Sequence, residues 1–260
     1  LIIFTKPWNS LSVCKIFKFM ILKNNLYTKD YLLKNKITYY QYAKGYRTGI
    51  EPIIIASKVN KQVKRILDMG CGCGSISLMV AFRNKYSNIY GWDKNHDFLL
   101  LANKSKLENN LNNLIFEKID NTKLNNNYIN YFDIILTNPP FFLENSVIKS
   151  NKKLVQDAKY ISKSQLEIWI RNMLYYLNFD GKAFLINRYA NLKLLINIFS
   201  KYDINLTIEP IKSYVGVGPN NLIMEVNKSD KFSYKIIDDL IIHDKNNKSG
   251  YTNILEKWMS

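Results

Sequence analysis

The sequence predicts an α/β protein built on a mostly parallel sheet with helices on both of its faces. From residue 65 onward, apolar runs of five or six residues alternate with longer segments in which apolar residues recur at helical spacing. This alternation is typical of parallel sheets, because each helix carries the chain back to the start of the next strand. No internal repeat and no linker rich in Pro, Gly or Ser interrupts it. We therefore expect a single domain over residues 20–260.

The elements expected ahead of the core are short. Residues 1–19 begin without Met and lack a clean apolar run followed by a small-residue cleavage site, so we expect an extension that precedes a natural start at Met20. Residues 20–60 are expected to form a cap segment, and residues 61–260 the core. Within the cap we expect a helix or short hairpin at 20–41, a turn at 45–49 and a short helix at 51–58 whose first turn suits Pro52.

The core elements follow in a regular order. We expect strands at 65–69, 88–93, 114–118, 132–137 and 182–187, and helices at 75–83, 97–109, 165–177 and 191–201. Residues 204–215 and 222–226 are expected to form a closing pair of strands. Asp180 and Gly181 are expected to interrupt the regular secondary structure between the third helix of this set and the strand after it. The run at 132–137 is apolar enough for burial on both faces.

The formal net charge of the chain is +16, from 37 basic and 21 acidic side chains. One interpretation is a polyanionic partner such as a nucleic acid, because Lys and Arg neutralise phosphates. The other is composition alone, since the whole chain is rich in Lys, Asn, Ile and Tyr. Charge by itself leaves both interpretations open.

The cysteines indicate a reducing compartment. Cys14, Cys71 and Cys73 are too few, and the last two too close together, for a disulfide framework, so we expect a cytoplasmic protein. No Cys/His cluster has zinc spacing, and no metal is expected. No run of about 18 apolar residues occurs, and we expect no membrane span. We expect a monomer.

A glycine-rich turn carries the strongest chemical signal. It follows the strand at 65–69 and reads Asp-Met-Gly-Cys-Gly-Cys-Gly over residues 68–74. Ligands of open α/β sheets lie beyond the carboxyl ends of the strands, and glycines there allow the backbone to approach them closely. The spacing G-x-G-x-G behind an acid departs from the dinucleotide pattern G-x-G-x-x-G and favours a cofactor without a pyrophosphate. The candidate cofactor residues are Asp68, which suits a methionyl ammonium group, and Gly70, Cys71, Gly72 and Gly74.

Acidic residues follow the next two strands at the same edge of the sheet. Asp93 ends the second strand, where such folds accept two ribose hydroxyls, and Asp120 follows the third, where a carboxylate can accept the adenine amino group. Asn121 competes with Asp120 for that role. A lone Asp after a strand is often only a cap or turn residue. Their shared position beyond consecutive strands favours the cofactor role.

The second specific signal is Asn138-Pro139-Pro140-Phe141, directly after the fourth strand. The two prolines fix an extended backbone and remove two N–H donors. The side-chain oxygen of Asn138 and the carbonyl oxygen of Pro139 can then both accept from one amino group. This moves its nitrogen toward sp3 character and directs the lone pair at a methyl electrophile. Phe141 is expected to stack on a planar base, with stacking energies of about 1–3 kcal/mol per base.

Together these motifs resemble the Asn-Pro-Pro-Phe class of S-adenosylmethionine-dependent methyltransferases. Within it, the chain is most similar to the tRNA1(Val) (adenine(37)-N6)-methyltransferase family and its close bacterial relatives. The resemblance runs from about Leu26 to the C-terminus. It includes Thr28-Lys29-Asp30, Gln41, the segment 45–51, the glycine motif, Asn138 to Phe141, Ile242-His243 and Gly250-Tyr251-Thr252.

The resemblance implies a Rossmann-like class I fold, with a seven-stranded, mostly parallel sheet and an antiparallel terminal strand. It implies S-adenosyl-L-methionine as the cofactor, RNA as the partner, and methylation of adenine N6 in tRNA near the anticodon. It adds Tyr46, Arg47, Thr48 and Gly49 as neighbours of the cofactor's methionine end. The chain departs from the family at Glu51, where Asp is usual, and at Asn220-Asn221, where basic residues are common; the second change concerns how RNA is held.

Other acceptors and other roles stay open. Guanine N2 of ribosomal RNA, or the glutamine amide of a release factor, would suit the same chemistry, and a non-catalytic RNA-binding relative would keep the fold. Phe141 favours a nucleobase as the methyl acceptor, because the release factor glutamine methyltransferases typically carry Tyr at that position. Arg188 is expected to face solvent and His243 to be structural. The loop at 145–153 is expected to form either a basic lid or a solvated loop.

Overall fold

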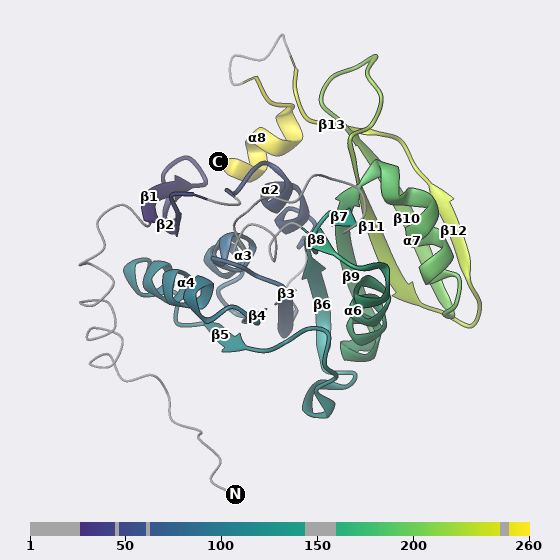
Figure 1. Ribbon diagram of the computed structural model, residues 1–260. Coiled ribbons are helices and arrows are strands. Elements are labelled where there is room, and N and C mark those ends of the chain that lie inside the picture. Colours follow the sequence, from purple (N-terminus) through teal and green to yellow (C-terminus); the bar gives the residue numbers. More distant parts are fainter. Residues whose placement is uncertain (1–26, 45–46, 61–62, 144–159, 245–249) are drawn as a thin grey trace, which may run out of the picture.

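The central sheet lies between two layers of helices (Figure 1). The computed structural model describes residues 27–44, 47–60, 63–143, 160–244 and 250–260. Within them the main sheet has nine strands in the order β12-β10-β11-β9-β6-β3-β4-β5, and β13 also pairs with β10. Its strands are β3 (Arg65–Met69), β4 (Asn88–Asp93), β5 (Leu114–Lys118), β6 (Phe132–Thr137), β9 (Leu177–Arg188), β10 (Ile204–Lys212), β11 (Asn221–Lys228), β12 (Ser233–Ile236) and β13 (Leu240–Ile241).

The remaining elements are short helices, an N-terminal hairpin and one small strand pair. The α-helices are α2 (Glu51–Ala56), α3 (Ser75–Arg83), α4 (His96–Glu108), α6 (Lys163–Tyr176), α7 (Leu192–Phe199) and α8 (Asn253–Met259). Two 3-10 turns occur at η1 (Asn126–Tyr128) and η2 (Tyr189–Asn191). The hairpin consists of β1 (Tyr27–Leu32) and β2 (Ile37–Tyr42), and the small parallel pair of β7 (Phe142–Leu143) and β8 (Tyr160–Ile161).

The predicted fold class is confirmed. Strands β5, β4, β3, β6 and β9 are parallel to one another. The antiparallel strand is β11, which pairs with β9 on one side and β10 on the other. The first four predicted core strands have the predicted bounds, and of the two alternatives open for residues 20–41 the hairpin is the one that forms over the described part.

Three details of the predicted sheet are wrong. The described sheet has nine strands and not seven, because β12 and β13 extend it beyond β10. All four residues of β12 are exposed, so no alternation of buried and polar residues marks it. Strand β9 runs through the expected break at 180–181, where an irregularity shifts its register against β6, and β10 ends at Lys212 rather than at residue 215.

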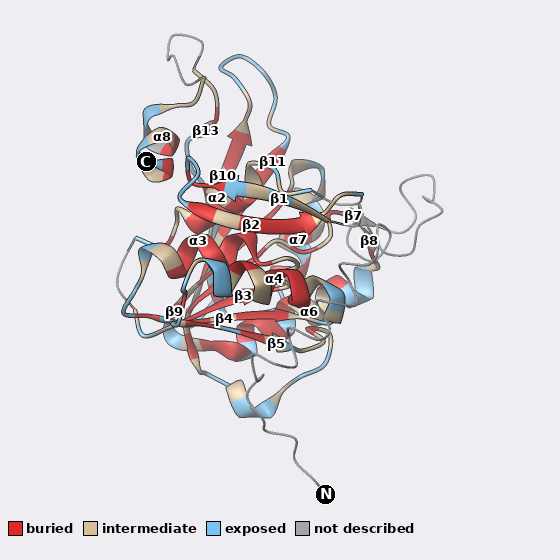
Figure 2. Ribbon diagram, turned by 90° about the vertical axis from the view of Figure 1, so that its left-hand side faces the viewer, coloured by how far each residue is buried: buried red, intermediate tan, exposed pale blue. Residues whose placement is uncertain are grey.

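Each face of the sheet packs against its own hydrophobic layer. Along β3, Ile66 belongs to the layer shared with α2, α3 and α4, and the next residue, Leu67, to the layer shared with α6 and α7. Ile134 and Ile135 of β6 divide in the same way. All four side chains are buried, which explains the apolar runs in these strands. The ribbon of the central sheet is accordingly coloured mostly as buried in Figure 2. No helix among the described residues is long and apolar enough to span a membrane.

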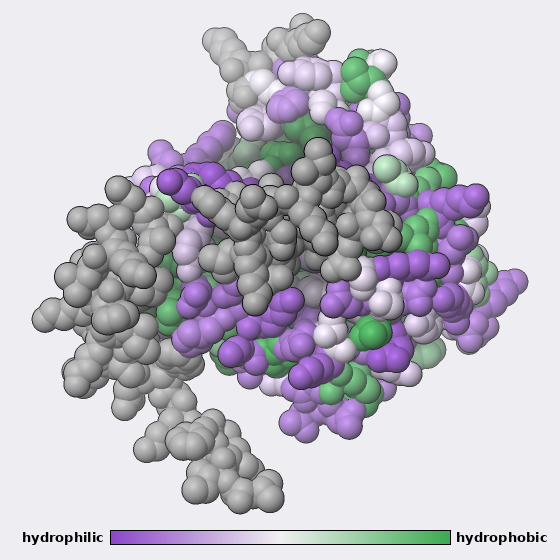
Figure 3. Space-filling view, in the orientation of Figure 1, coloured by the Kyte–Doolittle hydropathy of each residue, from purple (hydrophilic) through white to green (hydrophobic). Residues whose placement is uncertain are grey.

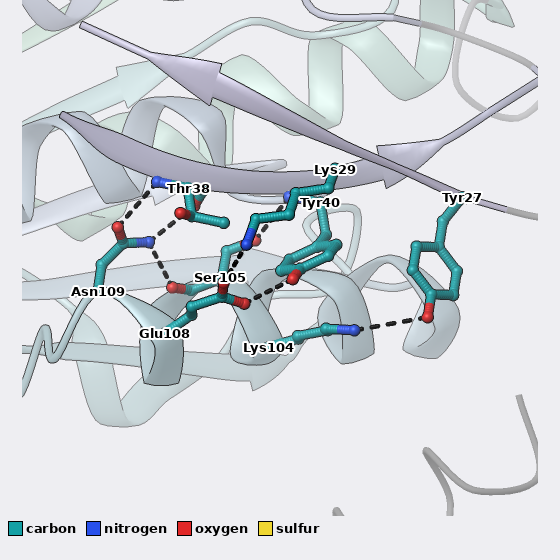
Figure 4. Close-up of polar contacts among 8 residues, drawn as sticks. All are labelled: Tyr27, Lys29, Thr38, Tyr40, Lys104, Ser105, Glu108 and Asn109. Atoms are coloured by element: carbon teal, nitrogen blue, oxygen red, sulfur yellow. Dashed lines mark hydrogen bonds and ion pairs between the residues drawn. The ribbon is translucent and has the colours of Figure 1, made fainter. Parts of the chain in front are cut away.

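The hairpin is held against α4 by side chains of the helix (Figure 4). Asn109 accepts from the backbone N–H of Thr38 at 2.8 Å and donates to its carbonyl oxygen at 2.7 Å. The Ser105 hydroxyl accepts from the Tyr40 N–H at 2.9 Å. These contacts pair the outer edge of β2 as a third strand would. The loop that leaves β2 is thereby placed at the carboxyl edge of the main sheet.

Candidate active site

A cavity of about 830 Å³ lies at the carboxyl ends of β3, β4, β5 and β6. Its wall comes from the turns after these four strands, the loop before α2, and parts of α6 and β9. Most of the residues predicted from the sequence line it, namely Arg47, Thr48, Gly49, Gly70, Cys71, Gly72, Asp93, Asp120, Asn121, Asn138, Pro139, Pro140 and Phe141. Tyr46 and the predicted loop at 145–153 lie outside the described residues.

The glycine turn after β3 is held by backbone hydrogen bonds. The N–H groups of Gly70 and Cys71 both donate to the carbonyl oxygen of Trp92 on the neighbouring strand, at 2.8 and 2.9 Å. Gly72 has φ +54°, and a Cβ placed on it would meet nothing within 4 Å, so its backbone faces open space. Gly74 is the N-cap residue of α3 and packs against Phe116, and it does not line the cavity. The turn therefore offers bare backbone to a ligand.

Asp68 lies behind this turn rather than on the cavity wall. It is 1% exposed, and its Oδ2 atom accepts from the backbone N–H and the hydroxyl of Ser77, at 3.0 and 2.5 Å. Burial raises the pKa of Asp68 to about 7. Its Oδ1 atom is buried and has no hydrogen-bond partner among the described residues. The carboxyl group thus stabilises the start of α3, and its contact with an ammonium group stays a prediction.

Asp93, the last residue of β4, links this strand to the glycine turn. Its Oδ2 atom accepts from the Gly72 N–H at 2.9 Å, and its Oδ1 atom from the Asn95 N–H at 2.8 Å. Burial raises the pKa of Asp93. Each carboxylate oxygen can accept a further hydrogen bond, and the residue lines the cavity. This arrangement suits a ligand that presents hydroxyl donors.

Asp120 and Asn121 differ in how their side chains are occupied. The Oδ1 atom of Asp120 accepts from the N–H and the hydroxyl of Thr122, at 3.0 and 2.7 Å. Burial acts to raise the pKa of Asp120, but these hydrogen bonds and the charges of Lys94 and Lys123 together outweigh it, and the pKa is lowered. Asn121 is 3% exposed, and its side-chain oxygen is buried without a described partner. Both residues line the cavity, so the prediction keeps both as candidates.

The turn after β6 brings Asn138 to the same cavity. Its side-chain oxygen is buried and has no hydrogen-bond partner among the described residues. Phe141 also lines the cavity but is only 8% exposed. The guanidinium carbon of Arg188 lies 5.6 Å from the centroid of its ring. Arg188 is half-buried and lines the cavity, so the prediction of a solvent-facing side chain is wrong.

The loop before α2 is tied to the hairpin by a polar cluster. Arg47 donates to both carboxylate oxygens of Asp30, at 3.0 and 3.1 Å. Gln41 donates to Asp30 at 3.0 Å and accepts from the Thr48 N–H at 3.0 Å. Tyr39 hydrogen-bonds to the Thr48 hydroxyl at 2.8 Å. The hairpin thereby fixes the backbone of residues 47–49 on the cavity wall.

Several wall residues were not predicted from the sequence, among them Trp169, Gln165, Lys94 and Tyr42. Trp169 lies on α6, where it occupies an apolar position with ordinary helical spacing. A Cβ on Gly70 would come within 2.7 Å of its ring. That close contact joins residues 99 positions apart in the chain, and nothing in the local pattern of α6 indicates it.

The unpaired oxygens around the cavity indicate what a ligand must present. Asn121 and Asn138 on the wall, and Asp68 behind it, each hold a buried acceptor atom without a described partner. Buried acceptors of this kind are costly unless a donor reaches them. No group of three or more His, Cys, Asp or Glu side chains suited to a metal occurs among the described residues. The cavity is therefore suited to a ligand rich in hydrogen-bond donors.

Comparison with known proteins agrees with the predicted resemblance. Residues 53–176 match the family model described as methyltransferase small domain. The chain is 31% identical over 188 residues to the release factor glutamine methyltransferase of Buchnera aphidicola subsp. Acyrthosiphon pisum, covering 67% of this chain and 63% of that protein. It is 25% identical over 209 residues to the tRNA1(Val) (adenine(37)-N6)-methyltransferase of Haemophilus influenzae, covering 78% of this chain and 85% of that protein.

Solved structures share the fold. A protein of Agrobacterium tumefaciens described as a predicted O-methyltransferase superposes with a TM-score of 0.65 at 18% identity, covering 80% of this chain and 96% of that one. P. horikoshii TYW2 in complex with MeSAdo superposes with a TM-score of 0.57 at 16% identity, covering 79% and 73%. The predicted resemblance to methyltransferases, including those named for tRNA1(Val), is confirmed, and so is the Rossmann-like fold. The chain spans about three fifths of the length of two release factor glutamine methyltransferases that it matches, those of Buchnera aphidicola subsp. Acyrthosiphon pisum and subsp. Schizaphis graminum.

Proposed function

We propose that this chain is an S-adenosylmethionine-dependent N-methyltransferase that methylates the N6 amino group of an adenine in tRNA. The match to the methyltransferase small domain supports the reaction class. Relatives named tRNA1(Val) (adenine(37)-N6)-methyltransferase, of which the chain covers up to 87%, support the acceptor. RNA as the substrate also agrees with the charge of +16 and with the cytoplasmic location expected from the cysteines.

One observation carries the proposal, which is the state of Asn138. Its side-chain oxygen is a buried acceptor without a described partner, on the wall of a cavity that also holds the glycine turn. A buried amide oxygen left without a donor costs about 1–3 kcal/mol. An amino group entering the cavity would supply the missing hydrogen bond. The Asn138 side-chain oxygen is thus placed to accept a hydrogen bond from a group such as an exocyclic –NH2.

The rest of the cavity fits the cofactor. S-adenosylmethionine presents an ammonium group, two ribose hydroxyls and an adenine amino group, all of them donors. The site offers acceptors at Asp93, Asp120 and Asn121, and a further unpaired oxygen on Asp68. Its volume of about 830 Å³ lies within the range of about 300–1,000 Å³ common for ligand pockets. The residues at 47–49 would close the methionine end.

The turn after β6 would orient the acceptor amine for the reaction. When bound, the cofactor supplies an electrophilic methyl group on a sulfonium centre, which is a good leaving group. Asn138 and the carbonyl oxygen of Pro139 would each accept a hydrogen bond from the acceptor's amino group. The two prolines fix the backbone that carries these acceptors, so little further entropy is lost in ordering that backbone when the amine binds. Orientation and desolvation then supply the rate. The methylated nitrogen would release its extra proton to water, so no side chain with a tuned pKa is needed.

A second candidate acceptor is the glutamine amide of a release factor. The specific observation in its favour is the 31% identity to the release factor glutamine methyltransferases of two Buchnera aphidicola subspecies. The primary amide of glutamine presents the same two hydrogens to Asn138. Phe141, which follows the two prolines, favours a planar base over the amide, because an apolar ring offers a stacking surface.

The test is a transfer assay on a panel of acceptors. Labelled S-adenosylmethionine would be incubated with the chain and with unmodified tRNA, ribosomal RNA or purified release factor. The proposal predicts label in tRNA, recovered as N6-methyladenosine. Label in the release factor alone would overturn the adenine assignment in favour of the second candidate. Calorimetry with the cofactor covers a non-catalytic RNA-binding role, which predicts no heat of cofactor binding.

A further inference from the structure

We propose that Thr137 is a positioning residue, whose hydroxyl fixes the acceptor turn that begins at Asn138 against the cofactor turn that begins at Gly70. This inference rests on the proposed methyl transfer. Thr137 is fully buried and does not line the cavity, so it touches neither the cofactor nor the acceptor. Its effect would pass through the two turns that do.

The hydroxyl of Thr137 bridges the ends of two neighbouring strands. It donates to the carbonyl oxygen of Met69 at 2.8 Å. Met69 and Thr137 are the last residues of β3 and β6, and they are paired in register. The next residues in the chain are Gly70 and Asn138. This side-chain hydrogen bond therefore adds to the pairing of β3 and β6 immediately before the cofactor motif and the acceptor motif.

The same hydroxyl also accepts from Nε1 of Trp169 at 3.0 Å. The Trp169 ring fills the space where Gly70 has no side chain, since a Cβ there would lie 2.7 Å from it. Trp169 lines the cavity. The indole therefore touches the cofactor turn with its ring and the end of β6 with its N–H. The hydrogen bonds to Met69 and from Trp169 both involve the Thr137 hydroxyl, which therefore connects β3, β6 and α6 at this point.

The acceptor turn depends on such side-chain support because of its own composition. Pro139 and Pro140 have no N–H groups, so two backbone donors that could tether the turn are absent. At its far end, Nδ2 of Asn191 donates to the carbonyl oxygen of Phe141 at 3.0 Å. Asn191 donates as well to Oδ1 of the fully buried Asn187, at 2.7 Å. The turn is thus braced at one end by Thr137 and at the other by Asn191.

The consequence concerns rate more than binding. Transfer of a methyl group requires the amine and the electrophile to be held within a narrow range of distance and angle. A displacement of about 1 Å at the reacting atoms can cost roughly 100-fold in rate. Cofactor affinity depends on the turns after β3, β4 and β5, which keep their own backbone hydrogen bonds without Thr137. Loss of the hydroxyl should therefore lower kcat while leaving KM for the acceptor and Kd for the cofactor nearly unchanged.

The experiment compares Thr137→Val with Thr137→Ser in the full chain, using whichever acceptor of the panel the wild-type chain methylates. Valine keeps the shape and removes the hydroxyl, and serine keeps the hydroxyl. We expect Thr137→Val to lower kcat by about 10- to 100-fold, with KM for the acceptor and Kd for S-adenosylmethionine changed less than about threefold. Thr137→Ser should restore most of kcat. A merely structural residue would not give this split.

Two further variants complete the test. Thr252→Val removes a hydroxyl that donates to the Ile241 carbonyl oxygen at 3.1 Å, outside the cavity, and should leave kcat unchanged. Trp169→Phe removes the indole N–H and should lower kcat even where Thr137→Val fails to fold. The positioning role is overturned if Thr137→Val keeps its kcat, or if foldable Trp169→Phe does. Absence of transfer by the wild-type chain would instead overturn the proposed function, and the positioning role with it.

Discussion

The two sides of the cavity are held in place by different means. On the cofactor side, the turn after β3 is fixed by backbone hydrogen bonds from Gly70 and Cys71 and by the carboxylate of Asp93. On the acceptor side, the turn after β6 contains two prolines and is braced by side chains from distant parts of the chain. The first side is held mainly by backbone groups bonded to the adjacent strand β4, whereas the second relies on side chains from several separate elements.

Because of this difference, we expect the two sides of the cavity to control different measured quantities. Groups on the cofactor side interact with the cofactor before and during the reaction, so their loss should weaken binding. Groups on the acceptor side act on the amine as it reacts, so their loss should lower kcat. Variants on the two sides therefore test whether the division holds.

The largest effect is expected at Asn138. Asn138→Ala removes the buried acceptor oxygen and should lower kcat by roughly 100- to 1,000-fold, by analogy with the loss of one polar group that orients a transition state. Kd for the cofactor should change little. Steady-state kinetics and calorimetry measure the two quantities. Asn127→Ala, at an exposed position of η1, is the matched control and should keep both values. If Asn138→Ala weakened cofactor binding as much as it lowered kcat, the proposed division between a binding side and a catalytic side would be contradicted.

A smaller effect is expected at Asp93, with the opposite pattern. Asp93→Ala removes an acceptor for a hydroxyl donor and frees the Gly72 N–H from its partner. Losing a hydrogen bond to a charged group costs about 1.5–3 kcal/mol, so we expect Kd for S-adenosylmethionine to rise about 10- to 100-fold. At saturating cofactor, kcat should stay near that of the wild-type chain. Calorimetry that finds unchanged affinity would contradict the role of Asp93.

Gly72 gives a finer test of the cofactor side. Gly72→Ala places a methyl group in open space at φ +54°, and Gly216→Ala does the same at φ +84° in the loop between β10 and β11. Left-handed backbone at a non-glycine residue costs about 1–2 kcal/mol, so both variants should lose a similar, small amount of stability. Thermal unfolding measures it. We expect weaker cofactor binding, by about tenfold, for Gly72→Ala alone; equal binding by both would show that Gly72 does not face the ligand.

The smallest effect is a pH dependence at Asp68. Burial raises the pKa of this carboxyl from 3.8 to about 7 in the folded protein. The folded state therefore binds more protons than the unfolded state between about pH 4 and 7, and this group's contribution to stability is lost as pH rises through that window. Asp68→Asn should flatten this part of the stability profile, as measured by denaturant titration at several pH values. A profile identical to that of the wild-type chain would contradict the raised pKa.

The sequence predicts the two motifs of the site, but not the packing around them, for a physical reason. Glycines at fixed spacing and an acid after a strand are local requirements of one turn, and they can be recognised in a dozen residues. Asn138 and its prolines are recognisable in the same way. The packing around them is not local, because Trp169 and Asn191 reach the turns from elements far along the chain. Their positions are set by how α6 and η2 pack on the sheet.

The same reasoning explains the errors in the predicted fold. Strand β3 and strand β6 are buried on both faces, so their apolar runs mark them clearly. Strand β12 is exposed along its length and pairs only at the edge of β10, where burial imposes no pattern. Arg188 ends β9 and was expected in solvent, but its guanidinium packs over Phe141. Hydrophobic periodicity reports burial, so it gives no signal for a strand that is exposed along its length and does not report where a charged side chain packs.

The most direct test of the central claim is a crystal structure of the chain with S-adenosylhomocysteine and an RNA that carries the acceptor adenine. We predict that the exocyclic nitrogen of the base lies within hydrogen-bond distance of the Asn138 side-chain oxygen, with the cofactor's sulfur beside the turn at residues 70–72. A complex in which the base occupies another surface, and the Asn138 oxygen still has no donor, would contradict it.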